Sequence, residues 1–355
     1  MASHLTFRNL TDERDYPLLL ELNHRSRQAD NDLDPITIEV IANLLSNMDG
    51  LSAQQGVVIA SQDEIPIGYS CLGWYSSRPE TRLYYQISTL HPESRSLWPL
   101  LVAENERRLR VIAAGHPPVS ECYFQAWASD QQKDWIAALE NGGYRVARRF
   151  NNMLYALGEA PVKSLPAGLE IRPVLPEHMR IIWEAQKEMN SGLFENVTED
   201  WLDEKFPAWL ANPENNPRFW QVAWDGNNLA GMVLARIDDK ENEKQSGKHG
   251  HTEHIFVRPQ WRGRGLASAL IARSLQVLKE QGVTEAELGV DAENESAAFR
   301  LYESLGYKTF SVDTWFRKAM KSLHKLLLWK LFKRSLHASR PGKDWKIFRW
   351  SRLPA

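Results

Sequence analysis

The sequence is poor in cysteine and contains no long apolar run. It has two cysteines, Cys71 and Cys122, which is too few for a disulfide framework, and both lie in apolar, strand-like stretches typical of buried free thiols. No run approaches the ~18 apolar residues of a membrane-spanning helix. The first residues also lack the basic and apolar regions of a secretory signal. These absences favour a globular protein of the cytoplasm.

The length and the charge distribution indicate more than one unit. A chain of 355 residues is long enough for two domains of ordinary size. The net charge is −2, but residues 317–352 carry twelve Lys or Arg and one acid, Asp344. That segment is strongly basic and the remainder is acidic. The asymmetry predicts that the C-terminal segment has a separate role.

An internal repeat predicts that the chain holds two copies of one domain. Residues 126–144 and 289–307 share a strand end, a polar turn, a short amphipathic helix, a glycine and a new strand. About 35 residues upstream of each, residues 90–98 mirror residues 257–265, and each follows a β-rich run and opens a helical pattern. Strands alternating with helices, together with hairpins, predict a mixed, largely antiparallel α/β sheet flanked by helices.

A glycine-containing turn precedes the long helical pattern of the second copy, in Arg262-Gly263-Arg264-Gly265-Leu266-Ala267. A P-loop would require Gly-x-x-x-x-Gly-Lys-Ser/Thr. A dinucleotide fingerprint would require Gly or Ala at the position of Ser268 and a tighter turn between strand and helix. Backbone N–H groups at such a helix start form an anion-binding site, and small residues let a pyrophosphate approach. Arg262-x-x-Gly265-x-Ala267 resembles the acetyl-CoA signature of the GNAT acyltransferase superfamily.

The resemblance implies further cofactor contacts and a proton donor. The backbone of Ile255, Phe256 and Val257 would pair with the pantetheine arm of acetyl-CoA. Asn294 and Tyr302 hold the places of the family's asparagine and tyrosine, and Tyr302 would protonate the departing thiolate. The alternatives are a tyrosine that packs on the sheet and an asparagine that only caps a helix.

The resemblance also implies a base that deprotonates the attacking amine. Alternation along a strand predicts that His251 and Glu253 share one face with the pantetheine-binding residues 255 and 257. His251 or Glu253 is therefore the expected base, and the neighbouring His249 and His254 are less well placed. The alternative is that each is a solvated strand residue.

The first copy lacks the residues that carry this chemistry. Opposite the three small residues of the turn stand Ser96, Trp98 and Leu100. Leu139 stands opposite Tyr302, and Gln131 opposite Asn294. A tryptophan would fill the space that a pyrophosphate needs, and a leucine donates no proton. The first copy is therefore predicted to keep the fold and to have lost the cofactor site.

These observations predict a degenerate GNAT-like domain over residues 1–158, a linker over 159–168 and a catalytic GNAT domain over 169–318. The expected activity is transfer of an acetyl group from acetyl-CoA to a primary amine on a small molecule or peptide, without a metal. The alternative is a non-catalytic acyl-CoA-binding regulatory module.

Residues 319–355 form the basic tail, whose Leu, Trp and Phe mix with Lys and Arg in a pattern typical of an amphipathic helix. It is predicted to dock on the acidic body, with an anionic membrane surface as the alternative and nucleic acid less favoured. The sequence does not determine the oligomeric state or the acceptor.

Overall fold

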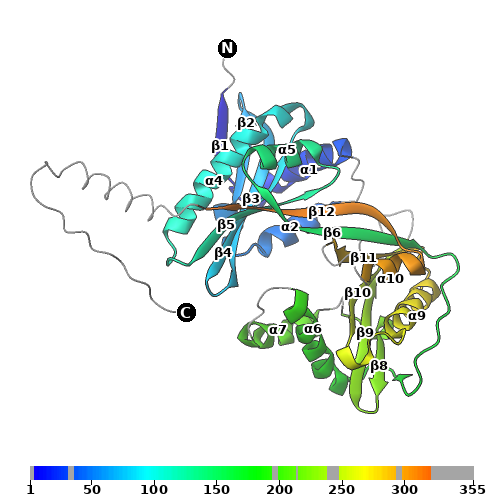
Figure 1. Ribbon diagram of the computed structural model, residues 1–355. Helices are drawn as coiled ribbons and strands as arrows, with labels where there is room; N and C mark the ends of the chain where they lie inside the picture. Colours follow the sequence, from blue (N-terminus) through cyan, green and yellow to red (C-terminus); the bar gives the residue numbers. More distant parts are fainter. Residues whose placement is uncertain are drawn as a thin grey trace, which may run out of the picture.

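The computed structural model describes residues 4–30, 36–193, 199–212, 215–237, 248–292 and 298–320. It contains a 12-stranded, largely antiparallel sheet with helices on both faces (Figure 1), which confirms the predicted α/β class. The strands are β1 Leu5–Asn9, β2 Val57–Gln62, β3 Ile65–Arg78, β4 Thr81–Leu90, β5 Glu121–Ser129, β6 Arg145–Ala156, β7 Glu170–Ile171, β8 Gln221–Asp225, β9 Asn228–Ile237, β10 His249–Val257, β11 Glu285–Asp291 and β12 Lys308–Ala319. The α-helices are α1 Tyr16–Ala29, α2 Ile38–Ser46, α3 Ala53–Gly56, α4 Trp98–Ala114, α5 Lys133–Asn141, α6 Met179–Leu193, α7 Glu199–Ala211, α9 Leu266–Glu280 and α10 Ala298–Leu305.

The two halves of the chain exchange their last strands. The sheet order is β1-β2-β3-β4-β5-β12-β6-β11-β10-β9-β8-β7. Strand β12 of the second half pairs with β5 of the first half, and β6 of the first half pairs with β11 of the second. Both exchanged strands lie side by side at the centre of the sheet (Figure 1). The predicted repeat is therefore one continuous sheet, in which each half completes the other.

Alternation of side chains along the strands places apolar cores on both faces of the sheet. In β2, Val58 and Ala60 join the core beneath α4 and α5, while Val57 and Ile59 join the core beneath α1 and α2. In the second half, α9 and α10 cover one core and α6 covers the other. The register through β6 and β12 puts α4, α5, α9 and α10 on the same face. The opposite face carries α1, α2 and α6 and is named the open face.

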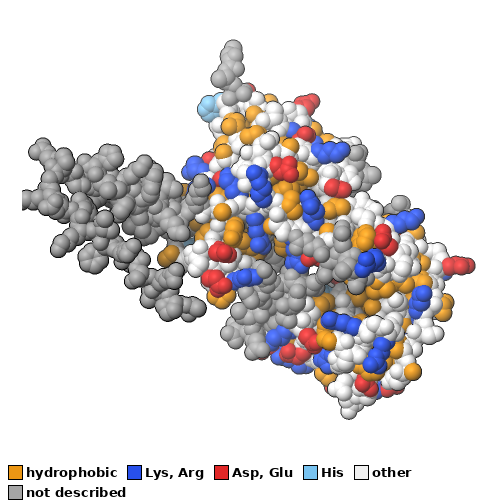
Figure 2. Space-filling view, in the orientation of Figure 1, with side chains coloured by type: hydrophobic (Ala, Val, Ile, Leu, Met, Phe, Trp, Pro, Cys, Tyr) orange, Lys and Arg blue, Asp and Glu red, His pale blue; other side chains and the backbone are white. Residues whose placement is uncertain are grey.

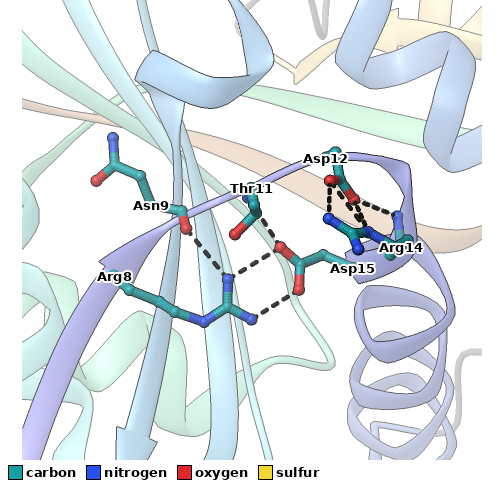
Figure 3. Close-up of polar contacts among 6 residues, drawn as sticks. All are labelled: Arg8, Asn9, Thr11, Asp12, Arg14 and Asp15. Atoms are coloured by element: carbon teal, nitrogen blue, oxygen red, sulfur yellow. Dashed lines mark hydrogen bonds and ion pairs between the residues drawn. The ribbon is translucent and has the colours of Figure 1, made fainter.

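The turn between β1 and α1 is fixed by charged hydrogen bonds (Figure 3). Arg8 donates from both terminal nitrogens to Asp15, at 2.9 and 2.7 Å. These bonds are the main reason that the pKa of Asp15 lies below its usual range. Asp15 also accepts the backbone N–H of Thr11 at 2.9 Å. The first helix is thus tied to the edge strand of the sheet.

Charged side chains of both signs are interspersed over both halves on the face seen in Figure 2. None of the helices among the described residues is long and apolar enough to cross a membrane. The predicted tail helix falls in residues 321–355 and Asn294 falls in residues 293–297, so both predictions lie outside the described residues.

Candidate functional site

The predicted phosphate-binding turn opens α9 with an uncapped helix N-terminus. Gly263 and Gly265 have φ of +74° and +82°, a left-handed region that favours glycine. A Cβ added at either position would meet nothing within 4 Å, so space is open beside the turn. No side chain caps the helix, which leaves its first N–H groups directed at that space. The geometry is that of an anion-binding helix start.

Both arginines of the turn lie back on the protein. The Nε atom of Arg262 donates to the backbone oxygen of Val257 at 2.9 Å. The guanidinium of Arg264 lies 4.7 Å from the ring centroid of Trp261, a cation–π contact. These contacts hold the turn against the end of β10 and keep positive charge beside it.

Strand β10 separates from β11 next to this turn. The two strands pair in parallel from His249↔Glu285 to His251↔Glu287, where their pairing ends. Farther along, Phe256 and Val257 pair only with β9, through Met232 and Gly231. The β11-facing edge of residues 255–257 is the edge that the sequence predicted for the pantetheine arm.

A β-bulge in β10 corrects the predicted arrangement of side chains. The register with β9 shifts between Glu253 and Phe256, and His254 has φ of +49°. His251 and Glu253 lie opposite Arg236 and Leu234, on the open face, whereas Ile255 and Val257 pack into the core beneath α9. The prediction that all four share one face was wrong, because the extra residue of the bulge reverses the alternation.

Glu253 and His251 form a small charged group on the open face. Glu253 accepts from Nε and Nη2 of Arg236, both at 3.3 Å. The Nδ1 atom of His251 lies 3.8 Å from Oε1 of Glu253. The two predicted bases are therefore neighbours, and Arg236 orients the carboxylate. Arg236 was not among the predicted site residues, because only the β9–β10 register brings it to Glu253.

Tyr302 lies on the other face, buried on α10 among the residues of the α9 core. Burial raises the pKa of Tyr302 to about 12, and among the described residues its phenol makes no hydrogen bond. The neighbouring Tyr307 differs, because its hydroxyl lies 2.8 Å from that of Thr252. Within the part of the chain that the structure describes, Tyr302 thus carries a protonated hydroxyl without a hydrogen-bond partner, on the α9 side of the sheet.

The first half presents a closed version of the same turn. Trp98 is buried and packs on Trp135 with ring centroids 4.6 Å apart. Arg95, the counterpart of Arg262, points into the protein, where its Nη2 lies 2.7 Å from Oδ1 of Asp30. Pro99 lies in the first turn of α4 and has no N–H to offer. Trp98 therefore occupies the space that an anion would need, and Pro99 removes one backbone donor from the helix start.

Strand β4, which precedes that turn, lacks the bulge found in β10. The register of β4 with β3 is continuous from Gly68↔Leu90 to Ser76↔Arg82, with no bulge in the part corresponding to 253–257. Leu139 fills the place of Tyr302 and is fully buried. The two halves thus share a fold, including a parallel strand that parts from its neighbour after Gln86↔Ala126, and they differ in the bulge, the glycines of the turn and the tyrosine.

Comparison with known proteins agrees with this geometry. Residues 180–307 match the sequence model of the family described as "Acetyltransferase (GNAT) family". The second half of the chain therefore carries a domain of the GNAT acetyltransferase family, whose co-substrate is acetyl-CoA. The predicted enzyme class is confirmed at the level of this family.

Two proteins with similar sequences are mycothiol acetyltransferases. The mycothiol acetyltransferase of Thermobispora bispora is 30% identical over 160 residues, which is 44% of this chain and 52% of the relative. That of Streptomyces scabiei is 28% identical over 235 residues, 64% of this chain and 67% of the relative. The aligned part of the chain spans about half to two thirds of the length of these relatives.

Solved structures with the same fold span nearly the whole chain. A GCN5-related N-acetyltransferase from Sphaerobacter thermophilus has a TM-score of 0.70 at 24% identity, covering 89% of this chain and 95% of its own. A tandem GNAT protein from the clavulanic acid biosynthesis pathway has a TM-score of 0.58 at 14% identity, covering 89% and 98%. These structures confirm, at the level of the fold, the tandem GNAT architecture that the internal repeat predicted.

Proposed function

We propose that this protein transfers an acetyl group from acetyl-CoA to a primary amine, and that only the second half performs the reaction. The observation that carries the proposal is the contrast between the two helix starts. The turn before α9 is open, uncapped and built on two left-handed glycines. The turn before α4 is filled by Trp98 and lacks a donor at Pro99. A pyrophosphate needs the first arrangement and is excluded by the second.

Acetyl-CoA would bind across the gap between β10 and β11. Its pyrophosphate would meet the N–H groups from Gly263 to Ala267, and its pantetheine arm would pair with the backbone of Ile255–Val257. Asn294 is proposed as an additional cofactor contact from its place in the family pattern. The thioester would then lie where the two strands separate, accessible from both faces of the sheet.

The placement of acid and base on opposite faces supports a direct attack. The amine would approach from the open face, where Glu253 or His251 takes its proton. Its nitrogen would attack the thioester carbonyl, and the tetrahedral adduct would collapse by breaking the carbon–sulfur bond. Tyr302, on the α9 side, would give its proton to the departing CoA sulfur. Burial keeps that phenol protonated at neutral pH.

The experiment is turnover of acetyl-CoA by the full chain over a panel of primary amines. Mass spectrometry of the acetylated amine and measurement of released CoA should give equal amounts. Release of CoA without an acetylated product, or no release with any amine, would contradict the proposal. Binding of acetyl-CoA in the absence of turnover would instead favour the non-catalytic acyl-CoA-binding module.

A further inference from the structure

A strip of aromatic side chains crosses the open face where the two halves exchange strands. Tyr85 on β4, Trp127 on β5, Trp315 on β12 and Phe150 on β6 form this aromatic strip, and consecutive ring centroids lie 5.3, 6.3 and 5.0 Å apart. None of the four rings belongs to an apolar core of the described residues, and all but Tyr85 are only half-buried. The strip thus runs from the buried Tyr85 to the partly exposed rings of Trp127, Trp315 and Phe150.

The register shows that the strip leads to the separated strands. One row of facing residues runs Ser129, Asp313, Phe150 and Asp291 across β5, β12, β6 and β11. The next row contains Trp127, Trp315 and Arg148. Asp291 ends β11, beyond its last pairing with β10. The strip thus begins beside the gap in which the thioester would lie.

Asp313 is a half-buried carboxylate within this strip. It accepts a hydrogen bond from Nδ2 of Asn152, at 2.8 Å, and among the described residues it has no cationic partner. The nearby cations are engaged elsewhere: Arg148 with Asp291 at 2.6 Å, and Arg317 with Gln125 at 3.0 Å. A half-buried carboxylate is stabilised by a cation.

The surroundings of Asp313 are those of a cation site. Phe150 faces it on the neighbouring strand and Trp315 lies two residues along on the same face. The guanidinium of Arg148 already lies 5.0 Å from the Phe150 ring centroid, so these rings accept positive charge. A carboxylate flanked by aromatic faces recognises ammonium groups through both charge and cation–π attraction.

We infer that Asp313, Trp315 and Phe150 form a subsite for a second ammonium group of the acceptor, which is therefore a long diamine or polyamine. Asp313 lies two strands from β11 and three from β10, a span of about 10–14 Å at ~4.8 Å per strand. One amine would reach the thioester while the other binds Asp313. This inference rests on the proposed function for the identity of the reacting end.

The test is equilibrium binding, by titration calorimetry, of an eight-carbon diamine and of octylamine to the full chain saturated with CoA. The diamine is expected to bind at least about tenfold more tightly, since a charged hydrogen bond accounts for a factor of this size. Asp313→Asn should remove most of that preference. Trp315→Leu should weaken the diamine about threefold to tenfold. Equal affinity for the two amines would overturn the inference.

Asp130→Asn is the matched control. Asp130 is exposed on the turn that follows β5, and its backbone N–H donates to the backbone oxygen of Val312 at 2.9 Å. The substitution therefore removes one negative charge close to the subsite, as Asp313→Asn does. Its effect on the diamine should stay within twofold, and a loss as large as that of Asp313→Asn would overturn the inference. Binding requires no turnover. A diamine preference that depends on Asp313 in a protein without acetyltransferase activity would sink the proposed function and leave the subsite standing.

Discussion

Removing the phenolic hydroxyl of Tyr302 isolates the proposed acid step. Tyr302 is buried, and its hydroxyl has no hydrogen-bond partner among the described residues. Tyr302→Phe keeps the ring in the core beneath α9 and leaves no donor or acceptor stranded. The free energy of unfolding should therefore change by less than about 0.5 kcal/mol. Acetyl-CoA affinity should be unchanged, because none of the predicted cofactor contacts involves Tyr302.

The expected loss is in turnover. A positioned general acid contributes roughly 10²–10⁴-fold to the rate, so kcat should fall by at least about a hundredfold. The pKa of Tyr302 is about 12, and an acid acts while it is protonated. The acid function is thus complete at neutral pH and is lost only as pH rises toward that value. The wild-type kcat should show no decline from this group below about pH 10.

The assay compares Tyr302→Phe with Tyr307→Phe. Tyr307 is also buried, but its hydroxyl bonds to that of Thr252 at 2.8 Å. Its variant should lose about 1 kcal/mol of stability and retain turnover. Steady-state kinetics and thermal unfolding of both proteins separate the two roles. Full kcat in Tyr302→Phe, or an equal loss in both variants, would refute the assignment of the acid.

Two further outcomes concern stability. Asp15→Asn should lower the free energy of unfolding by about 1 kcal/mol at pH 7, because it breaks the partly exposed pair with Arg8. The pKa of Asp15 is lowered in the folded protein, so this contribution is present above the unfolded value and fades as pH falls through the folded one. Thermal melts at pH 7 and pH 3 should show the difference shrinking, and a constant difference would contradict the pairing. Lys318→Met should cost about 1–3 kcal/mol in urea unfolding, because Lys318 on β12 bonds Glu106 on α4 at 2.6 Å. The exposed Lys308→Met on the same strand should cost little, and equal costs would show that this ion pair does not hold the exchanged strand.

Local features of the site were predictable from the sequence. The turn at 262–267 combines small residues with a helix start, and both properties depend on neighbours in the chain. The loss of the turn in the first half could also be expected from the sequence, because Trp98 stands where a small residue is needed beside a phosphate. The internal repeat also shows that Leu139, which donates no proton, stands in the place of Tyr302.

The features that depend on strand pairing were not predictable. The bulge at His254 puts His251 and Ile255 on opposite faces of the sheet. No residue type in that stretch indicates a bulge. The exchange of β6 and β12 brings Phe150 and Trp315 together although they are far apart in sequence. Arg236 reaches Glu253 only through the β9–β10 register. These contacts are set by tertiary structure, which local patterns do not encode.

Titration of the full chain with acetyl-CoA tests the central claim that one half binds the cofactor. The wild type should bind one acetyl-CoA per chain. Gly265→Asp should weaken it by more than about a hundredfold, because a carboxylate at the helix start repels the pyrophosphate. Gly282→Asp is the control, since Gly282 is also left-handed, at φ +79°, with open space around it, and its affinity should match the wild type. Two sites per chain, or undiminished binding by Gly265→Asp, would contradict the account.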